Sequence, residues 1–249
     1  MKVIAVIPAR MASTRFPGKP LADILGLPMI EHVRRRVLLC PEINEVIVAT
    51  CDNEILHLVQ NYGGHAVMTS DQHERCTDRV AEVMDTKNAD LVINVQGDEP
   101  LVNPEMFGPL LQPLKNEKDL LCTNLMTECE SDIEFKNPNV VKTVCDPNGN
   151  ALYFSRESIP SPHKTGTLLY KKYKQLGVIA FRKEFLKEFT KLPPTPLEQV
   201  ESVDMLRAVE HGYKVRMVCS TFKVIGVDVP ADLVHAIALM KKDPLFNSY

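Results

Sequence analysis

No stretch of this sequence is apolar for long enough to cross a bilayer. The longest apolar runs, such as Val3 to Pro8, fall far short of the ~20 residues that a membrane-spanning helix needs. No cleavable signal follows the N-terminus, where the first strand is expected to begin almost at once. We therefore expect a cytoplasmic protein that has no membrane partner.

An excess of positive charge is also lacking. The 29 Lys and Arg residues are balanced by 32 Asp and Glu residues, which gives a formal net charge of -3. Such a molecule has no overall attraction for nucleic acid or for an anionic membrane. Nucleic acid is therefore not an expected partner, and any phosphate site must be built from a few local cations.

Paired cysteine motifs are missing. The seven cysteines are an odd number and contain no CxxC pair, which argues against a disulfide framework and against a zinc cage. Most of them are expected to be small buried side chains in a reducing compartment. His57, His65 and His73 recur every eight residues, and this spacing fits no single helix face, so a metal role is not expected for them.

Neither common glycine-rich nucleotide motif is present after the first expected strand. The segment that follows it, residues 9–21, has one glycine and matches neither GxGxxG nor GxxxxGK[ST]. It does place Arg10, Arg15 and Lys19 at the C-terminal end of a strand, where open α/β sheets bind ligands. Three neighbouring cations suit a triphosphate, and the alternative is a solvated cationic turn.

Short apolar runs alternate with helical patterns in the first half of the chain, which predicts a parallel sheet with right-handed crossovers. At 249 residues we expect one α/β domain, residues 1–249, with an inserted antiparallel β-rich subregion at about residues 137–181. The expected helices are 28–39, 52–61, 77–85, 183–190, 197–209 and 231–240; the expected strands include 3–8, 45–50, 65–70, 91–98, 140–144, 151–155, 175–181 and 215–219.

A series of motifs covers nearly the whole chain. They are P-A-R-x-x-S-x-R-x-P-x-K-P-L from Pro8, VIVAT at 46–50, GG-x-AVMTS at 63–70, TDR-x-AEV at 77–83, NVQGDEP at 94–100, ALYFSR at 151–156 and GVD-x-P-x-DL at 226–233. Their identity and order resemble the sugar-acid cytidylyltransferases, and most closely the branch that acts on 3-deoxy-manno-octulosonate (Kdo).

This resemblance implies a Rossmann-like nucleotidyltransferase fold and a homodimer. It also implies transfer of CMP from CTP to the hydroxyl of an acidic sugar, with release of pyrophosphate, for lipopolysaccharide or other cell-surface glycan synthesis. Asp98 and Asp228 are the implied Mg²⁺ ligands, in keeping with the preference of this hard cation for a few carboxylates plus phosphate oxygens. From the residues alone, Glu99 is an alternative ligand, and Asp98 could instead cap a helix or turn.

The resemblance also implies which residues contact each substrate. Arg10, Lys19, Asp98 and Asp228 form the implied catalytic set. Arg156 would pair with the acceptor carboxylate. Glu201 and Asp204 are expected on one face of the helix 197–209, where the alternative is an exposed helix surface. The full nucleotide set is Ala9, Arg10, Ser13, Arg15, Lys19, Arg75, Cys76, Arg79 and Gln96, and the acceptor set is Gln96, Arg156, Gln175, Glu201 and Asp204.

Several positions depart from the family pattern. Arg75 and Cys76 replace a small Ser-Gly pair, Gln175 and Ile179 replace a His and a Tyr, and Met205 replaces a Gln. Because a site built to hydrogen-bond a hydroxyl discriminates strongly, these changes predict a different acceptor. The alternatives to Kdo are therefore an amino-modified Kdo, another ulosonic acid or a phosphonate, and a third hypothesis is a non-catalytic nucleotide-binding paralogue.

Overall fold

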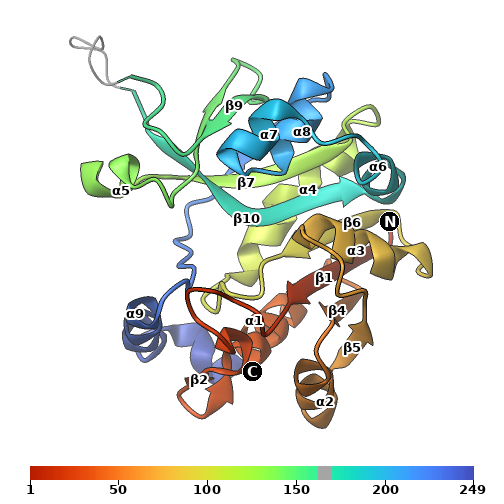
Figure 1. The fold of residues 1–249 in the computed structure, drawn as a ribbon, viewed down its shortest axis with the longest axis vertical. Coiled ribbons are helices and arrows are strands. Elements are labelled where there is room, and N and C mark those ends of the chain that lie inside the picture. The colour runs from red at the N-terminus through yellow and green to blue at the C-terminus, as the bar shows by residue number, and fades with distance from the viewer. Residues whose placement is uncertain (162–169) are drawn as a thin grey trace. The chain divides into compact units, whose positions relative to one another are not determined.

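The computed structural model describes residues 1–161 and 170–249 (Figure 1). The part of the expected β-rich subregion at 162–169 lies outside the described residues. The described chain forms two compact units, Met1–Gly108 with Lys223–Tyr249 (unit 1) and Pro109–Phe222 (unit 2).

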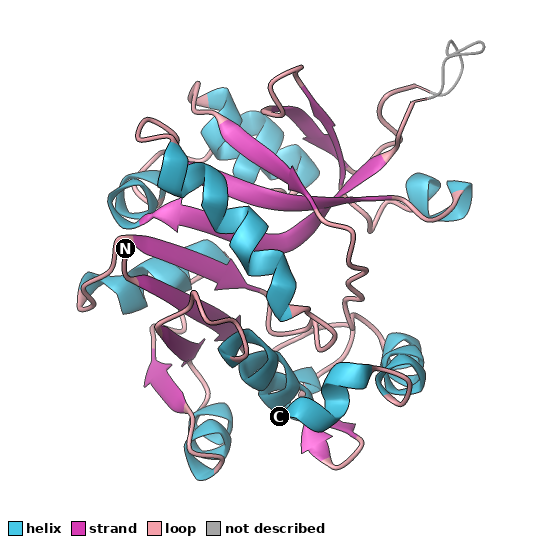
Figure 2. Cartoon of the chain, turned by 180° about the vertical axis from the view of Figure 1, so that it is seen from behind, coloured by secondary structure: helices cyan, strands magenta, loops and turns pink. Residues whose placement is uncertain are grey.

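Unit 1 is built on parallel strands, as the alternating pattern predicted. The strand order is β6-β1-β4-β5, and Val6 of β1 lies opposite Ile47 of β4 and Asn94 of β6. All residues of β1 are buried, because parallel strands are covered on both faces. These strands lie side by side in Figure 2. Their bounds are β1 (Val3–Ala9), β4 (Glu45–Thr50), β5 (His65–Met68) and β6 (Leu91–Val95).

The helices of unit 1 confirm those expected from the sequence, with small shifts at their ends. Pro28, expected in the first turn of a helix, instead precedes it as the N-cap and ends a short strand. The two-residue strands of that hairpin are too short for a periodic sequence signal. The elements are β2 (Asp23–Ile24), β3 (Leu27–Pro28), α1 (Met29–Leu38), α2 (Asn53–Asn61), α3 (Cys76–Asp85), α9 (Pro230–Met240), and the 3-10 helices η1 (Lys19–Leu21), η2 (Pro104–Met106) and η4 (Pro244–Ser248).

Most strand pairs of unit 2 are antiparallel. β10 pairs antiparallel with β7 and with β8, β8 pairs antiparallel with β9, and β11 runs parallel to β7. The predicted change to antiparallel pairing is therefore confirmed, while the single-domain organisation stays a prediction. The strands are β7 (Cys122–Glu128), β8 (Lys142–Cys145), β9 (Ala151–Ser155), β10 (Tyr173–Arg182) and β11 (Val215–Cys219).

The expected helix 197–209 is wrong, because two short helices replace it. Ser202 has φ 52° and ψ 51°, a left-handed conformation that ends the first helix, and Asp204 is the N-cap of the second. Glu201 and Asp204 therefore do not lie on one face of one helix. The helices are α4 (Phe107–Asn116), which starts in unit 1, α5 (Asp132–Lys136), α6 (Lys183–Phe189), α7 (Pro196–Glu201) and α8 (Met205–Glu210).

All seven cysteines are free thiols in the structure. The expectation that most are buried is wrong, since only Cys40 and Cys122 are buried. Cys76 and Cys219 are exposed, because they lie at the start of α3 and at the end of β11. No helix in the described part of the chain combines the length and apolarity needed to cross a membrane.

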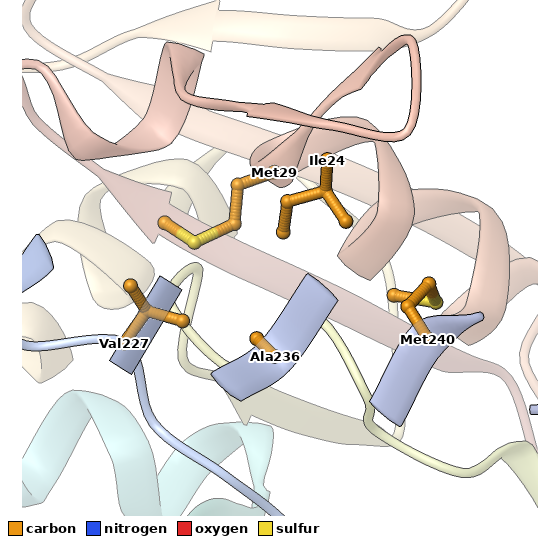
Figure 3. Close-up of a cluster of buried hydrophobic side chains, with 5 residues drawn as sticks. All are labelled: Ile24, Met29, Val227, Ala236 and Met240. Carbon is orange, nitrogen blue, oxygen red and sulfur yellow. The ribbon is translucent and has the colours of Figure 1, made fainter. Parts of the chain in front are cut away.

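The last part of the chain packs on unit 1 through a small apolar cluster (Figure 3). Ile24 and Met29 lie against Val227, Ala236 and Met240, and all five side chains are fully buried. Partly buried side chains, including Leu233, Ile237 and Phe246, surround them. The cluster therefore connects the segment around residue 228 to the start of α1.

Candidate active site

A cavity of about 320 Å³ opens in unit 1 at the C-terminal ends of its parallel strands. It is lined by the loop after β1, by the start of α3, by the turn after β6 and by Asp228. This is the edge at which open α/β sheets bind ligands. Every residue predicted to contact nucleotide or metal lines it: Ala9, Arg10, Ser13, Arg15, Lys19, Arg75, Cys76, Arg79, Gln96, Asp98 and Asp228.

The loop after β1 is held in a compact turn that directs its cations inward. The N–H groups of Ser13 and Gly18 both donate to Met11 O, at 2.9 Å and 3.0 Å. Gly18 has φ 71°, which favours glycine, and it leads directly into the 3-10 helix that begins at Lys19. Ser13 Oγ accepts a hydrogen bond from Phe16 N at 3.3 Å, so in this structure it stabilises the turn.

Two carboxylates from distant parts of the chain meet at the ammonium of Lys19. Its Nζ lies 2.6 Å from Asp98 Oδ2, 3.4 Å from Asp228 Oδ1 and 3.0 Å from Val227 O. Asp228 Oδ1 also accepts from Arg15 Nη2 at 3.0 Å. The side chain of Lys19 is only 14% exposed, whereas that of Arg15 is 52% exposed. Lys19 is therefore a fixed cation of the cavity, and Arg15 can reorient towards a ligand.

Asp98 does not end the strand, as the sequence pattern had suggested, because β6 stops at Val95. The turn that follows requires glycine at position 97, since a Cβ there would lie 2.9 Å from Pro8 O and 3.2 Å from Ile30 Cδ1. This close approach brings Asp98 against β1 and α1. The carbonyl of Asp98 accepts from Val227 N at 2.9 Å, which connects the two acidic segments through the backbone.

The donor set fits a hard cation that is shared with phosphate oxygens. Asp98 Oδ2 lies 2.6 Å and Asp228 Oδ1 lies 3.4 Å from the same atom, Lys19 Nζ, so the two carboxylates are close enough together to share one cation. Among the described residues, no three His, Cys, Asp or Glu side chains are grouped to hold a metal ion. Mg²⁺ accepts one or two carboxylates when a substrate supplies further oxygens. Glu99, the alternative ligand, is buried and is not among the residues that line the cavity.

The opposite wall of the cavity comes from residues 73–79. Arg79 is buried and donates through Nη1 to Thr69 Oγ1. Glu82 of α3 holds the preceding loop, because its Oε2 accepts from Ser70 N at 2.9 Å and lies 2.5 Å from His73 Nε2. Burial raises the pKa of the Glu82 carboxyl, but the Ser70 N–H and His73 outweigh burial and lower it overall.

Two residues of this wall were not predicted from the sequence. His73 and Glu74 line the cavity, although His73 had been considered only as a metal ligand. The available signal was their position directly before Arg75 and Cys76, in the loop that leads into the TDR motif.

Arg156 and Glu201, two of the acceptor candidates, lie together in unit 2. Arg156 Nε donates to Glu201 O at 2.6 Å, and the Arg156 N–H donates to Glu201 Oε2 at 2.7 Å. Ser155 Oγ donates to the other carboxylate oxygen at 2.7 Å. Burial raises the pKa of Glu201, but hydrogen bonds from Arg156, Ser155 and Tyr153 outweigh burial and lower it. Glu201 is therefore an ionised acceptor that organises the Arg156 backbone.

Two further acceptor candidates, Gln175 and Asp204, also lie in unit 2. Gln175 Nε2 donates to Asn124 Oδ1 at 2.6 Å, and Asp204 occupies the N-cap position of α8 without a side-chain capping hydrogen bond. Ile179 and Met205, two of the departures from the family pattern, are buried in the core of unit 2. Apolar side chains at these positions are therefore consistent with packing.

A cluster of cations suited to phosphate groups lies at the ends of parallel strands, beside a pair of carboxylates. This combination of fold and site is typical of a nucleotidyltransferase. The chain matches the family described as Cytidylyltransferase over residues 4–217. It is 44% identical to the 3-deoxy-manno-octulosonate cytidylyltransferase of Geobacter metallireducens, over 97% of this chain and 99% of the relative. It is 43% identical to the enzyme of the same name from Fusobacterium nucleatum, over 98% of each chain.

Solved structures give the same result. A CMP:2-keto-3-deoxy-manno-octonic acid synthetase complexed with CTP is 40% identical, with a TM-score of 0.91, over 97% of this chain and 99% of that one. The 4-diphosphocytidyl-2C-methyl-D-erythritol synthase of Anaerococcus prevotii, 16% identical with a TM-score of 0.62 over 96% and 99% of the two chains, shares the fold. The chain belongs to the cytidylyltransferase family, among the 3-deoxy-manno-octulosonate cytidylyltransferases, and it is a CTP-dependent nucleotidyltransferase with a Rossmann-like α/β fold.

Proposed function

We propose that this protein transfers CMP from CTP to a hydroxyl of Kdo, forming CMP-Kdo and releasing pyrophosphate. The observation that carries this proposal is the convergence of Arg15, Lys19, Asp98 and Asp228 in one cavity. The acceptor follows from relatives named for Kdo that match the chain at 43% to 44% identity over nearly its full length. These relatives favour Kdo over the other acids and over a non-catalytic paralogue.

In the reaction, the acceptor hydroxyl oxygen bonds to the α-phosphorus of CTP while the bond to the pyrophosphate oxygen breaks, and the hydroxyl proton is released. Lys19 places a fixed positive charge where negative charge increases on the α-phosphate. Arg10 and Arg15, both exposed at the cavity, screen the β- and γ-phosphates. No covalent enzyme intermediate is needed.

Asp98 and Asp228 are the residues that would hold Mg²⁺, which would screen the triphosphate and polarise the acceptor hydroxyl. On nucleotide binding, Arg15 exchanges its Asp228 contact for phosphate oxygens, which frees carboxylate oxygens for the cation. Arg15 is well suited to this exchange because half of its side chain is exposed.

The other lining residues provide recognition of the nucleotide. Ala9 and Ser13 contact the phosphates through the loop after β1, and Gln96 hydrogen-bonds the ribose or the acceptor. The base lies towards the wall that contains Arg75, Cys76 and Arg79. Because Arg75 and Cys76 are larger than the small pair typical of the family, this wall contacts the nucleotide with side chains as well as backbone.

In unit 2, Arg156 is the proposed partner of the acceptor carboxylate. Its guanidinium already donates to Glu201 O and to Pro138 O, so it would share one of these bonds with the substrate. Glu201 supports Arg156, while Gln175 and Asp204 are proposed partners of the sugar hydroxyls. The enzyme is further proposed to be a cytoplasmic homodimer that provides CMP-Kdo for lipopolysaccharide synthesis.

Pyrophosphate release with Mg²⁺ and CTP across a panel of acceptors tests this proposal. The panel contains Kdo, 8-amino-Kdo, another ulosonic acid and a simple phosphonate, and UTP replaces CTP as a control. We expect release with Kdo. Release only with another acid would show that Kdo is not the acceptor, while the proposed transfer of CMP would stand. CTP binding without pyrophosphate release in any mixture would support the non-catalytic paralogue.

A further inference from the structure

The chain after Asp228 is anchored on α1 by a buried polar network, separate from the active-site cavity. Arg36 of α1 is 1% exposed and forms an ion pair with Asp243. Its Nε donates to Tyr249 Oη at 3.0 Å, and its Nη1 donates to Val102 O at 3.2 Å. A buried guanidinium with these partners fixes the end of the chain against one turn of α1.

His32 makes a second hydrogen bond to the hydroxyl of Tyr249 and so fixes its position further. His32 Nε2 lies 2.8 Å from Ile24 O, and because a carbonyl can only accept, this nitrogen carries the proton. Nδ1 is therefore the acceptor for Tyr249 Oη, at 2.8 Å. The hydroxyl of Tyr249 donates to His32 and accepts from Arg36, so both of its hydrogen-bonding roles are used.

The same segment is attached to the catalytic loop at its other end. Val227 N donates to Asp98 O, and Val227 O accepts from Lys19 Nζ. The N–H groups of Asp228 and Val229 donate to Asp232 Oδ2 at 2.9 Å and 3.0 Å. The direction of the Asp228 side chain is thus set jointly by the Val227 contacts and by the placement of α9.

Helix α9 packs on the cluster mainly through apolar side chains that are only partly buried, including Leu233 and Ile237. Ala236 and Met240 are its only buried side chains, and Val234 is 69% exposed. Met240 Sδ also lies 3.5 Å from Arg36 Nη2, so the apolar cluster in Figure 3 and the polar network share one end of the helix. The network around Tyr249 therefore supplies directional contacts that the helix itself lacks.

We propose that Arg36 and Tyr249 are positioning residues for Asp228, which hold the chain from 229 to 249 on α1 so that this carboxylate stays beside Lys19 and Asp98. The effect on catalysis rests on the proposed function, in which Asp228 acts at the cation and triphosphate. The docking itself can be measured without either ligand. Ile30, whose Cδ1 would lie 3.2 Å from a Cβ at position 97, and Met29, which belongs to the same buried cluster as Val227, make α1 the common reference for both carboxylates.

The first test measures hydrogen exchange of the amides at 227–229, 231 and 232 without metal or nucleotide, since residue 230 is proline. Tyr249→Ala removes the ring and the hydroxyl, and we expect exchange at these amides to increase by about tenfold or more, because local opening becomes easier. Tyr249→Phe keeps the ring and should give a smaller increase. Tyr213→Phe is the matched control, since it removes a hydroxyl that donates to Glu188 in unit 2.

The second test is the Mg²⁺ dependence of pyrophosphate release at saturating CTP and Kdo. For Tyr249→Ala, we expect the Mg²⁺ concentration for half-maximal activity to rise about tenfold, while kcat at saturating Mg²⁺ stays within about twofold of wild type. Tyr249→Phe should lie between the two, and the Tyr213→Phe control should match wild type. A uniform fall in kcat with no change in the Mg²⁺ dependence would contradict a positioning role.

The two readouts separate the possible failures. Unchanged exchange at 227–232 in a folded Tyr249→Ala variant would overturn the proposal whatever the activity. If wild type itself releases no pyrophosphate, the proposed function fails, and the exchange measurement still decides whether the network places Asp228. If Tyr249→Ala does not fold, Tyr249→Phe provides the same comparison with only an oxygen removed.

Discussion

The ammonium of Lys19 lies 2.6 Å from the carboxylate of Asp98, although 79 residues separate the two in the chain. Lys19 follows β1 and Asp98 follows β6, and these strands are parallel neighbours with Val6 opposite Asn94. The pairing of two buried strands therefore brings together the proposed phosphate-binding cation and the proposed metal-binding carboxylate. This relationship connects the fold to the proposed chemistry.

Replacing Lys19 should remove much of the electrostatic stabilisation of the transferring phosphate. We expect Lys19→Met to lower kcat by about 10² to 10³, the usual effect of losing one preorganised charge-stabilising group. Steady-state pyrophosphate release measures this, with the exposed Lys191→Met as a control for loss of charge. A Lys19→Met enzyme within a few-fold of the control would contradict the role given to this ammonium.

The turn after β6 should tolerate no side chain at position 97. Gly97→Ala forces a Cβ against Pro8 O and Ile30, and overpacking of this kind costs about 1–3 kcal/mol of the free energy of unfolding. Gly226→Ala is a matched control, because a Cβ there meets nothing within 4 Å. Thermal and urea unfolding of both variants measure the difference. Equal stability of the two would show that the turn can relax.

Much of unit 1 could be predicted because its signals are local. The buried residues of β1 and the cations that follow them lie in one short segment. The rule that ligands bind at the C-terminal ends of parallel strands then predicts that the cavity residues lie close together. β7 escaped prediction because Thr123, Asn124 and Thr127 interrupt its apolar pattern. These side chains are nevertheless buried, and Asn124 Nδ2 donates to Leu176 O and Val178 O at 2.9 Å.

Long-range features could not be predicted from the sequence. The break at Ser202 depends on a left-handed backbone conformation, which a serine in the sequence does not indicate. The network of His32, Arg36 and Tyr249 joins residues more than 200 positions apart, with no motif to mark it. The contacts between Arg156 and Glu201 depend on where α7 ends, and the helical pattern of residues 197–209 does not show that end.

Because Ser202 has a left-handed conformation, we expect glycine to be more stabilising than alanine at this position, the reverse of their order inside a helix. A side chain in the left-handed region costs roughly 1–2 kcal/mol, whereas glycine carries no such penalty. Ser202→Gly and Ser202→Ala both remove the hydroxyl, so their difference isolates the backbone. We expect the glycine variant to have the higher free energy of unfolding by about 1 kcal/mol, measured by urea denaturation. The opposite order, which is normal inside a helix, would contradict the αL assignment.

His32 should make stability fall in mildly acidic solution. Burial lowers the pKa of His32 below its ordinary value of 6.5. The hydrogen bond to the Ile24 carbonyl opposes this, but the charges of Arg36 and Arg35 add to the effect of burial, and the pKa is lowered overall. Above the ordinary pKa of 6.5, His32 is neutral in both the folded and the unfolded protein, and its contribution to the free energy of unfolding has its full value. As pH falls below it, the unfolded chain binds a proton first, so stability is lost at up to about 1.4 kcal/mol per pH unit.

Urea unfolding between about pH 7.5 and pH 5 measures this effect. His32→Gln cannot titrate, so the difference between wild type and this variant isolates His32 from the other histidines. We expect that difference to shrink as the pH falls. A constant difference over the whole range would show that His32 titrates equally in the folded and unfolded states.

Direct detection of the product tests the central claim. Wild-type protein, the Asp98→Asn variant and a no-enzyme blank are incubated with CTP, Kdo and Mg²⁺, and CMP-Kdo is identified by mass spectrometry and ³¹P NMR. The account predicts CMP-Kdo and equimolar pyrophosphate with wild type, and neither with folded Asp98→Asn. CTP that stays intact with wild type, or equal product from both proteins, would contradict it.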